Sequence, residues 1–241
     1  MRRMRLPFFP LHAVTFPHLP LPLHVFEPRY RAMARDLVAE GSQFGGRFVT
    51  GLIVEGREAG DPDARTGSMG TICEVHTAEQ LPDGRWVLLA VGVARATLGA
   101  VDGTGEYAVV EAEPMEDTDG AMDPALLPAV QSALDAYMET VKRFVTATAS
   151  VGHESHEVSG VAASLDDVLK PIQLPSDPSA ASYAVGGLLQ IELVRKQQLL
   201  ELPDAASRLR VELDLLRRES QLLAESALPP IPTSDLGYHP N

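Results

Sequence analysis

The sequence has 241 residues, 45% of them hydrophobic and 22% charged, which is the balance of a globular protein with enough chain for one large domain or two small ones. A formal net charge of −13 repels phosphate backbones and disfavours general nucleic-acid binding. The single cysteine, Cys73, excludes an intramolecular disulfide, suits a reducing compartment and is expected to be a small buried hydrophobe.

The N-terminal segment, MRRMRLPFFPLHAVTFPHLPLPL, superficially resembles a signal peptide because arginines precede apolar residues. Prolines at positions 7, 10, 17, 20 and 22 interrupt any continuous apolar helix, and no small-residue cleavage site follows. No later stretch reaches the roughly 18 apolar residues that a membrane span needs. We expect a cytoplasmic protein that does not enter a membrane.

Up to about residue 118 the pattern is mostly that of β-strands. LPFFPL forms an extended opening segment whose prolines favour the edge of a sheet. The turn LPDGR, with Pro82, Asp83 and Gly84, predicts a hairpin between two later strands. Several short strands with one helix indicate a closed or half-closed β-barrel rather than a parallel sheet. Four β-rich runs are bounded by Gly, Pro and Asp: FGGRFVTGLIVEG, MGTICEVHTAEQ, RWVLLAVGVARATLGAV and YAVVEAEPM.

The one helix expected in this half is EPRYRAMARDLVAEG. Pro28 suits the first helical position, where its missing N–H is not needed, and Gly41 is expected to end the helix in a left-handed conformation. The helical spacing of the apolar residues indicates that one face covers a core. That face comprises Tyr30, Met33, Ala34, Leu37 and Val38.

After about residue 119 the apolar period becomes helical. A first helix is expected in AMDPALLPAVQSALDAYMETVKRFVTAT, with Asp123 as its cap. The segments SYAVGGLLQIELVRKQQLLEL and PDAASRLRVELDLLRRESQLLAES are expected to form an antiparallel hairpin of two helices, packed on the first. We therefore expect a β-rich part over residues 1–118, a helical bundle over 119–228, and an extended or disordered tail over 229–241.

Motifs for catalysis or cofactor binding are each incomplete. His153, Glu154, His156 and Glu157 have the spacing H-E-x-H rather than H-E-x-x-H, and they lie in a polar connector, so we expect no metal. GSQFGGRF lacks the lysine of a phosphate loop and follows a helix instead of a strand, so its glycines are interpreted as a helix stop and a strand entry. TGSMG lacks the first glycine of G-x-S-x-G. We expect no catalytic residues and no cofactor.

Several of these segments together resemble the N-terminal domain of Lon proteases. The resemblance covers FPLHAVTFPHLPLPLHVFEPRYRAM, FGG…GLIVEG, MGTICEV and LPDGRWVLLAVGVARATL, and later KQQLLEL…ASRLRVELDLLRRE, in the expected order. It implies an α+β protein in which a PUA-like β pseudo-barrel precedes a helical bundle. It also implies recognition of unfolded or tagged proteins. With no ATPase or peptidase motif, the sequence looks like a free-standing bacterial protein built from this domain alone.

The stretch PLPLHVFEPRY raises a more local hypothesis. Its prolines stiffen the chain before Pro28 starts the helix, so Phe26, Glu27 and Arg29 are held at a fixed barrel-to-helix junction. These three residues form the candidate peptide-binding site, with an apolar ring flanked by opposite charges. The alternative is purely structural: Phe26 belongs to the core, and Glu27 and Arg29 pair locally.

Three functions remain open at this point. The leading hypothesis is a non-enzymatic module that binds unfolded polypeptide or a partner protein, including Lon-type protease machinery. The PUA-like resemblance also allows binding to structured RNA, but residues 1–60 carry only eight arginines against five acids, which is a small basic surplus. An unrecognised hydrolase is the third alternative, and no site for it is found.

Overall fold

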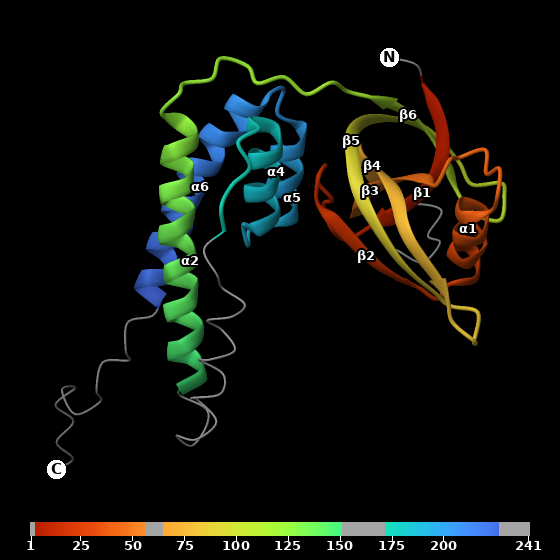
Figure 1. Cartoon of the computed structure of the whole chain (residues 1–241), viewed down its shortest axis with the longest axis horizontal. Coiled ribbons are helices and arrows are strands. Elements are labelled where there is room, and N and C mark those ends of the chain that lie inside the picture. The colour runs from red at the N-terminus through yellow and green to blue at the C-terminus, as the bar shows by residue number, and fades with distance from the viewer. Residues whose placement is uncertain (1–2, 56–64, 151–171, 227–241) are drawn as a thin grey trace, which may run out of the picture. The chain divides into compact units, whose positions relative to one another are not determined.

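A computed structural model describes residues 3–55, 65–150 and 172–226 of the chain (Figure 1). The six strands and helix α1 occupy the first part of the chain and the other helices the second, which confirms the predicted α+β class and the change of period near residue 119. The strands are β1 (Met4–Leu11), β2 (Pro20–Val25), β3 (Arg47–Glu55), β4 (Arg65–Gln80), β5 (Trp86–Asp102) and β6 (Val109–Pro114). The helices are α1 (Pro28–Val38), α2 (Leu126–Ser150), α4 (Pro178–Leu188), α5 (Leu193–Glu201) and α6 (Ala205–Ser226).

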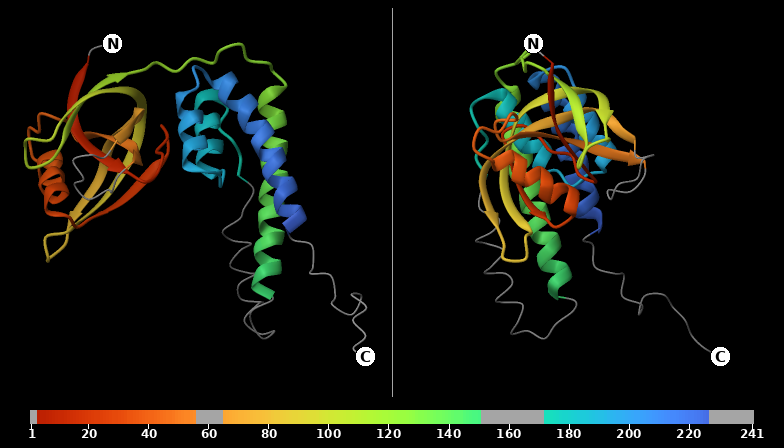
Figure 2. Two further views of the ribbon diagram at one scale, coloured as in Figure 1. Left: turned by 180° about the vertical axis from the view of Figure 1, so that it is seen from behind. Right: turned by 90° about the vertical axis from the view of Figure 1, so that its right-hand side faces the viewer.

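The six strands form one sheet that closes on itself. Their order is β2-β5-β4-β3-β1-β6, and a further pairing between β5 and β6 completes the ring. Closure is possible because β5 is long: its first part pairs with β2 over Trp86–Val91, and its last part pairs with β6 over Ala96–Asp102. The result is the β-barrel that the sequence predicts, with β2 attached as an additional strand (Figure 2).

The expectation that β1 lies at a sheet edge is wrong, because β1 lies between β3 and β6. The ladder with β6 ends at Pro7, and the ladder with β3 begins at Phe8. Each half of the strand therefore has one partner, so two prolines are tolerated in an interior strand. In contrast, β2 has one partner, β5, among the described residues, and Pro20 and Pro22 lie at an edge.

The hairpin between β4 and β5 turns where the sequence predicts it. The backbone N–H of Gly84 donates to the carbonyl of Leu81 at 2.8 Å, and Gly84 has a φ of 80°, which favours glycine. The Asp83 carboxylate accepts a hydrogen bond from the backbone N–H of Arg85 at 3.1 Å. The hairpin tip is consequently a rigid turn.

Helix α1 packs against the barrel through an apolar face, as predicted (Figure 1). Two details differ: Val38 is exposed and Ala32 is buried. The helix ends at Val38, and Gly41 adopts a left-handed conformation in the turn that follows rather than at the helix end itself. The core under α1 contains Phe9, Val25, Tyr30, Met33, Ala34, Leu37, Phe48, Cys73, Leu88 and Ala90.

The helical part differs from the sequence expectation in one respect. SYAVGGLLQIELVRKQQLLEL is not one helix but two, since α4 ends at Leu188 and α5 begins at Leu193. Two adjacent glycines, Gly186 and Gly187, lower helix propensity just before the break. Asp177 caps the start of α4 by accepting a hydrogen bond from the N–H of Ala180 at 2.7 Å.

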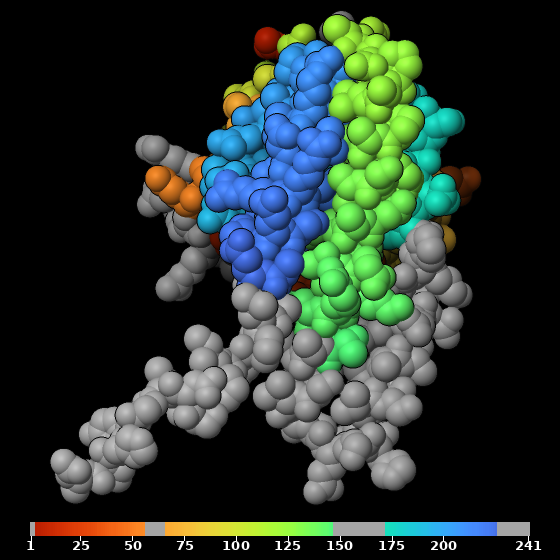
Figure 3. All heavy atoms as spheres, turned by 90° about the vertical axis from the view of Figure 1, so that its left-hand side faces the viewer, coloured from red at the N-terminus to blue at the C-terminus, as the bar shows by residue number. Residues whose placement is uncertain are grey.

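The chain separates into two compact units, each of which combines segments that are far apart in the sequence. Unit 1 contains residues 1–127 and 174–212, so α4, α5 and the first part of α6 belong with the barrel. Unit 2 contains residues 128–173 and 213–241, in which α2 and the C-terminal part of α6 lie side by side (Figure 3). The boundary at residue 118 marks the change of secondary structure, and its role as a domain boundary stays a prediction.

Candidate functional site

The junction between β2 and α1 turns sharply from strand to helix. Val25 is buried in the core, whereas the ring of Phe26 is 61% exposed. Glu27 is the N-cap residue in extended conformation, and Pro28 occupies the first turn of the helix. Since Pro28 has a fixed φ, the backbone around Phe26 has little freedom. The structural alternative, with Phe26 in the core, is therefore wrong.

Glu27 and Arg29 pair with each other, as the structural alternative expects. The Nε and Nη2 of Arg29 both lie 3.1 Å from Oε2 of Glu27. The Arg29 guanidinium also lies over the ring of Tyr30, 4.4 Å from its centroid. Both charged side chains are about three-quarters buried, so they brace the first turn of α1. Their direct contact with a ligand stays a prediction.

Phe26 continues an exposed apolar surface that the sequence analysis missed, here called the β2–β5 face (Pro22, His24, Phe26, Val87 and Leu89). His24 is paired with Val87 and Pro22 with Leu89 across the two strands, so their side chains lie on the same side. Val87 and Leu89 are 44% and 39% exposed. The rings of His24 and Phe26 lie 6.3 Å apart. The continuous apolar run RWVLLAVGV conceals this alternation in the sequence.

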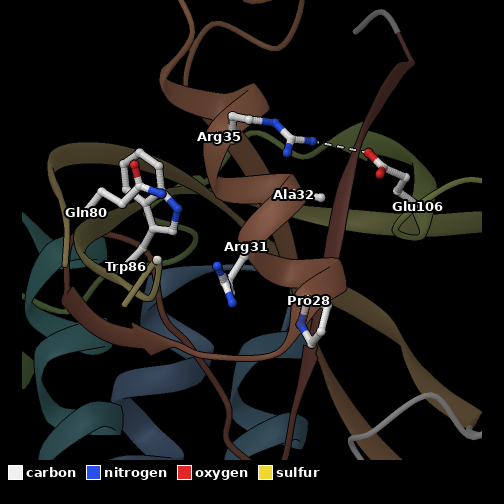
Figure 4. A pocket seen from close by; sticks show the side chains of 8 residues that line it. Pro28, Arg31, Ala32, Arg35, Gln80, Trp86 and Glu106 are labelled. Atoms are coloured by element: carbon white, nitrogen blue, oxygen red, sulfur yellow. Dashed lines mark hydrogen bonds and ion pairs between the residues drawn. The ribbon is translucent and has the colours of Figure 1, made fainter. Parts of the chain in front are cut away.

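A pocket of about 300 Å³ lies beside the junction (Figure 4). Its walls come from α1, from the tip of the β4–β5 hairpin, and from the loop before β6. The close-up shows Arg31 and Arg35 on one side of α1, with the cross-strand pair Gln80 and Trp86 opposite. The lining residues are Pro28, Arg31, Ala32, Arg35, Gln80, Gly84, Trp86 and Glu106.

The loop before β6 is held to α1 by two contacts. The Tyr107 hydroxyl donates to Oδ2 of Asp36 at 2.8 Å, and burial followed by that hydrogen bond raises the pKa of Tyr107. Nη2 of Arg35 lies 3.2 Å from Oε2 of Glu106, at the rim of the pocket (Figure 4). The pocket therefore combines two guanidinium groups and an indole ring with one carboxylate.

A second charged cluster is buried in unit 1. Arg95 and Arg208 both lie beside Asp117, with nitrogen–oxygen distances of 3.2 and 3.1 Å. The Tyr183 hydroxyl donates to Asp117 at 2.5 Å, and the Arg208 guanidinium lies 4.2 Å from the centroid of the Tyr183 ring. Burial is the main cause of the raised pKa of Tyr183. Because both arginines are fully buried, this cluster stabilises the fold and is closed to ligands.

The sequence matches the family described as the ATP-dependent protease La (LON) substrate-binding domain over residues 5–218. The chain belongs to this family. Lon proteases of Rhizobium meliloti and Escherichia coli K12 are 26% and 22% identical to it, over 90% and 92% of this chain. These matches cover 24% and 26% of the two proteases, so the chain spans about a quarter of their length.

Solved structures show the same fold. The Lon N-terminal domain protein from Xanthomonas campestris matches with a TM-score of 0.56 and 22% identity, covering 88% of this chain and 98% of that one. The N-terminal domain of the Mycobacterium avium complex Lon protease matches with a TM-score of 0.52 and 19% identity, covering 89% and 98%. The resemblance inferred from the sequence is thus confirmed for family and fold.

The motifs considered for chemistry occupy structural places in this Lon-family domain. Gly41 and Gly46 both adopt left-handed conformations between α1 and β3: Gly41 lies in the turn that follows the helix, and Gly46 immediately precedes the strand. TGSMG lies within β4 and not in a strand-to-helix turn. Burial raises the pKa of Cys73 to about 12, so it is a neutral thiol and not a nucleophile at ordinary pH.

The described residues contain neither a candidate metal site nor a candidate membrane-spanning helix. His153, Glu154, His156 and Glu157 lie outside the described residues. Within residues 3–55, 65–150 and 172–226, no three His, Cys, Asp or Glu side chains come together in a way that could hold a metal ion. In the same ranges no helix combines the length and apolar character needed to cross a bilayer.

Proposed function

We propose that this Lon-family domain binds unfolded polypeptide segments on the β2–β5 face, without catalysis of its own. The observation that carries the proposal is the 61% exposure of Phe26 at a rigid junction, next to exposed Val87 and Leu89. Unfolded chains display apolar side chains that folded proteins bury. A preformed apolar surface gains free energy from covering such side chains and loses little conformational entropy.

The edge of β2 favours side-chain recognition over strand addition. Pro20 and Pro22 lack backbone N–H groups, so a peptide that paired with this edge would find donors missing at two positions. Binding by main-chain hydrogen bonds is therefore weak here. Apolar contacts with the β2–β5 face supply the affinity, which suits ligands that vary in sequence.

Belonging to the Lon substrate-binding family supports a substrate-recognition module. The proposal that the ligand is an unfolded segment rests on the exposed β2–β5 face. A Lon-type protease as a partner also stays a proposal. An unfolded segment and a protease partner would both bind through apolar contacts. A folded partner, however, would not be displaced from its surface by unfolded chains of unrelated sequence.

The test compares a labelled polypeptide that remains unfolded in buffer with the same polypeptide locked in its folded form by a disulfide. We expect fluorescence anisotropy to show saturable binding of the unfolded form alone. A structured RNA hairpin, measured at two salt concentrations, is the comparison ligand. Steeply salt-dependent RNA binding with no polypeptide signal would contradict the proposal and favour the RNA-binding function.

A further inference from the structure

Arg31 projects into the pocket from the exposed side of α1 (Figure 4). Within the described ranges its guanidinium forms no ion pair and no side-chain hydrogen bond. A guanidinium has five N–H donors in a fixed planar arrangement, which suits carboxylates. In a chain with a net charge of −13, Arg31 is thus a cation beside a pocket with no ion-pair partner among the described residues.

Asp83 does not form an ion pair with Arg31. Asp83 interacts with Arg31 at longer range, but its two oxygens are occupied by Arg85: Oδ1 by the backbone N–H and Oδ2 by the guanidinium at 2.6 Å. The hydrogen bond from that backbone N–H is the main cause of the lowered pKa of Asp83. Gly84 lets the guanidinium approach the turn, because a Cβ there would overlap with it.

A second guanidinium lies one helical turn further along α1. Arg35 already contacts Glu106 at 3.2 Å and Asp36 at 3.5 Å. The side chains of Arg35 and Glu106 are 62% and 71% exposed, and such surface pairs contribute little free energy. A ligand carboxylate can therefore displace Glu106 at small cost. Arg31 and Arg35 are about 6 Å apart along the helix axis, close to the repeat of alternate side chains in an extended peptide.

We propose that the pocket binds the side-chain carboxylate of an Asp or Glu in the bound polypeptide. Arg31 is the primary partner of the carboxylate, and the half-buried ring of Trp86 packs against the methylene groups of the same Asp or Glu side chain. Pro28 both lines the pocket and follows Phe26 by two residues, so the pocket adjoins the β2–β5 face. The preferred ligand is thus an extended segment with apolar side chains next to an acid. This inference rests on the proposed function.

The experiment uses two labelled peptides, both acetylated and amidated at their ends, so that the only carboxylate is in a side chain. One carries Phe and Leu beside Glu, and the other has Gln in place of Glu. We expect the Glu peptide to bind the full chain about three- to tenfold more tightly at low salt, and less so at high salt. Arg31→Gln should remove the preference, while Glu106→Gln should strengthen binding of the Glu peptide.

Arg47→Gln is the matched control. It removes the same charge, but Arg47 pairs with Glu74 at 2.8 Å and does not line the pocket, so the preference should persist. Equal binding of the two peptides to the unmodified protein, or a preference that survives Arg31→Gln, would overturn this inference and leave the proposed function intact. Binding of neither peptide would contradict both.

Discussion

Glu212 shows how burial decides the behaviour of a single residue. Its side chain is fully buried, and neither carboxylate oxygen has a hydrogen-bond partner among the described residues. Burial raises the pKa of Glu212 well above its ordinary value of 4.5, with Arg208 opposing the shift. The spacing of apolar residues in α6 does not predict that Glu212 is buried, because apolar and charged residues alternate around it along the helix.

The raised pKa has a predictable effect on stability. Between pH 4.5 and the folded-state pKa, folded Glu212 holds a proton that the unfolded chain has released, so the free energy of unfolding falls as pH rises through that range. Glu212→Gln removes this loss. We expect the difference in melting temperature, variant minus wild type, to become more positive from about pH 5 to about pH 8. A difference that stays constant with pH would contradict the buried, proton-binding carboxyl.

At the scale of elements, periodicity predicts α1, the β4–β5 hairpin and the long strands, because each depends on local residues. The contact that joins β5 to the turn between α5 and α6 could not be predicted. Arg95 donates from Nη1 to the carbonyl oxygens of Leu200, at 3.1 Å, and Leu202, and from Nη2 to that of Pro203 at 2.6 Å. Nothing in the sequence around Arg95 reveals these distant partners.

Arg95→Met should therefore destabilise the fold. The variant leaves three buried carbonyl groups without the donor Arg95 and removes one of the two arginines beside Asp117, which together cost about 3–5 kcal/mol in the free energy of unfolding. Arg47→Met is the comparison variant: its exposed pair with Glu74 is expected to contribute at most about 1 kcal/mol. Urea denaturation of both variants measures the two changes. Equal losses would show that the Arg95 contacts do not stabilise the fold.

For the whole molecule, the sequence predicts the family and the fold class. The division into two compact units could not be predicted, because it depends on contacts between segments that are distant in the sequence. The exposure of Phe26 could not be predicted either, because an aromatic residue after a buried strand is equally consistent with core and surface. The pocket was missed because its residues come from separate segments: α1, the hairpin and the loop before β6.

The sequence also leads us to expect no catalytic turnover by the purified chain. None of its three lysines stands in the G-x-x-x-x-G-K-[ST] pattern of a phosphate loop, and no nucleophile lies in a recognisable setting. Assays with ATP and with casein should show no product above a buffer control. Turnover that copurifies with the protein through several columns would reveal a site that the motifs do not show.

The central claim is that the β2–β5 face binds unfolded polypeptide, and Phe26→Ala tests it most directly when affinity and stability are measured on the same sample. We expect binding to weaken by about 1–3 kcal/mol, as for an interface anchor. The free energy of unfolding should change by no more than about 0.5 kcal/mol, because the ring is exposed.

Val101→Ala is the control for this measurement, since Val101 is 50% exposed on the same strand β5 but lies outside the face. It should leave polypeptide affinity unchanged. If Phe26→Ala binds unfolded polypeptide as tightly as wild type does, Phe26 is not a binding residue, and the account of the β2–β5 face is contradicted.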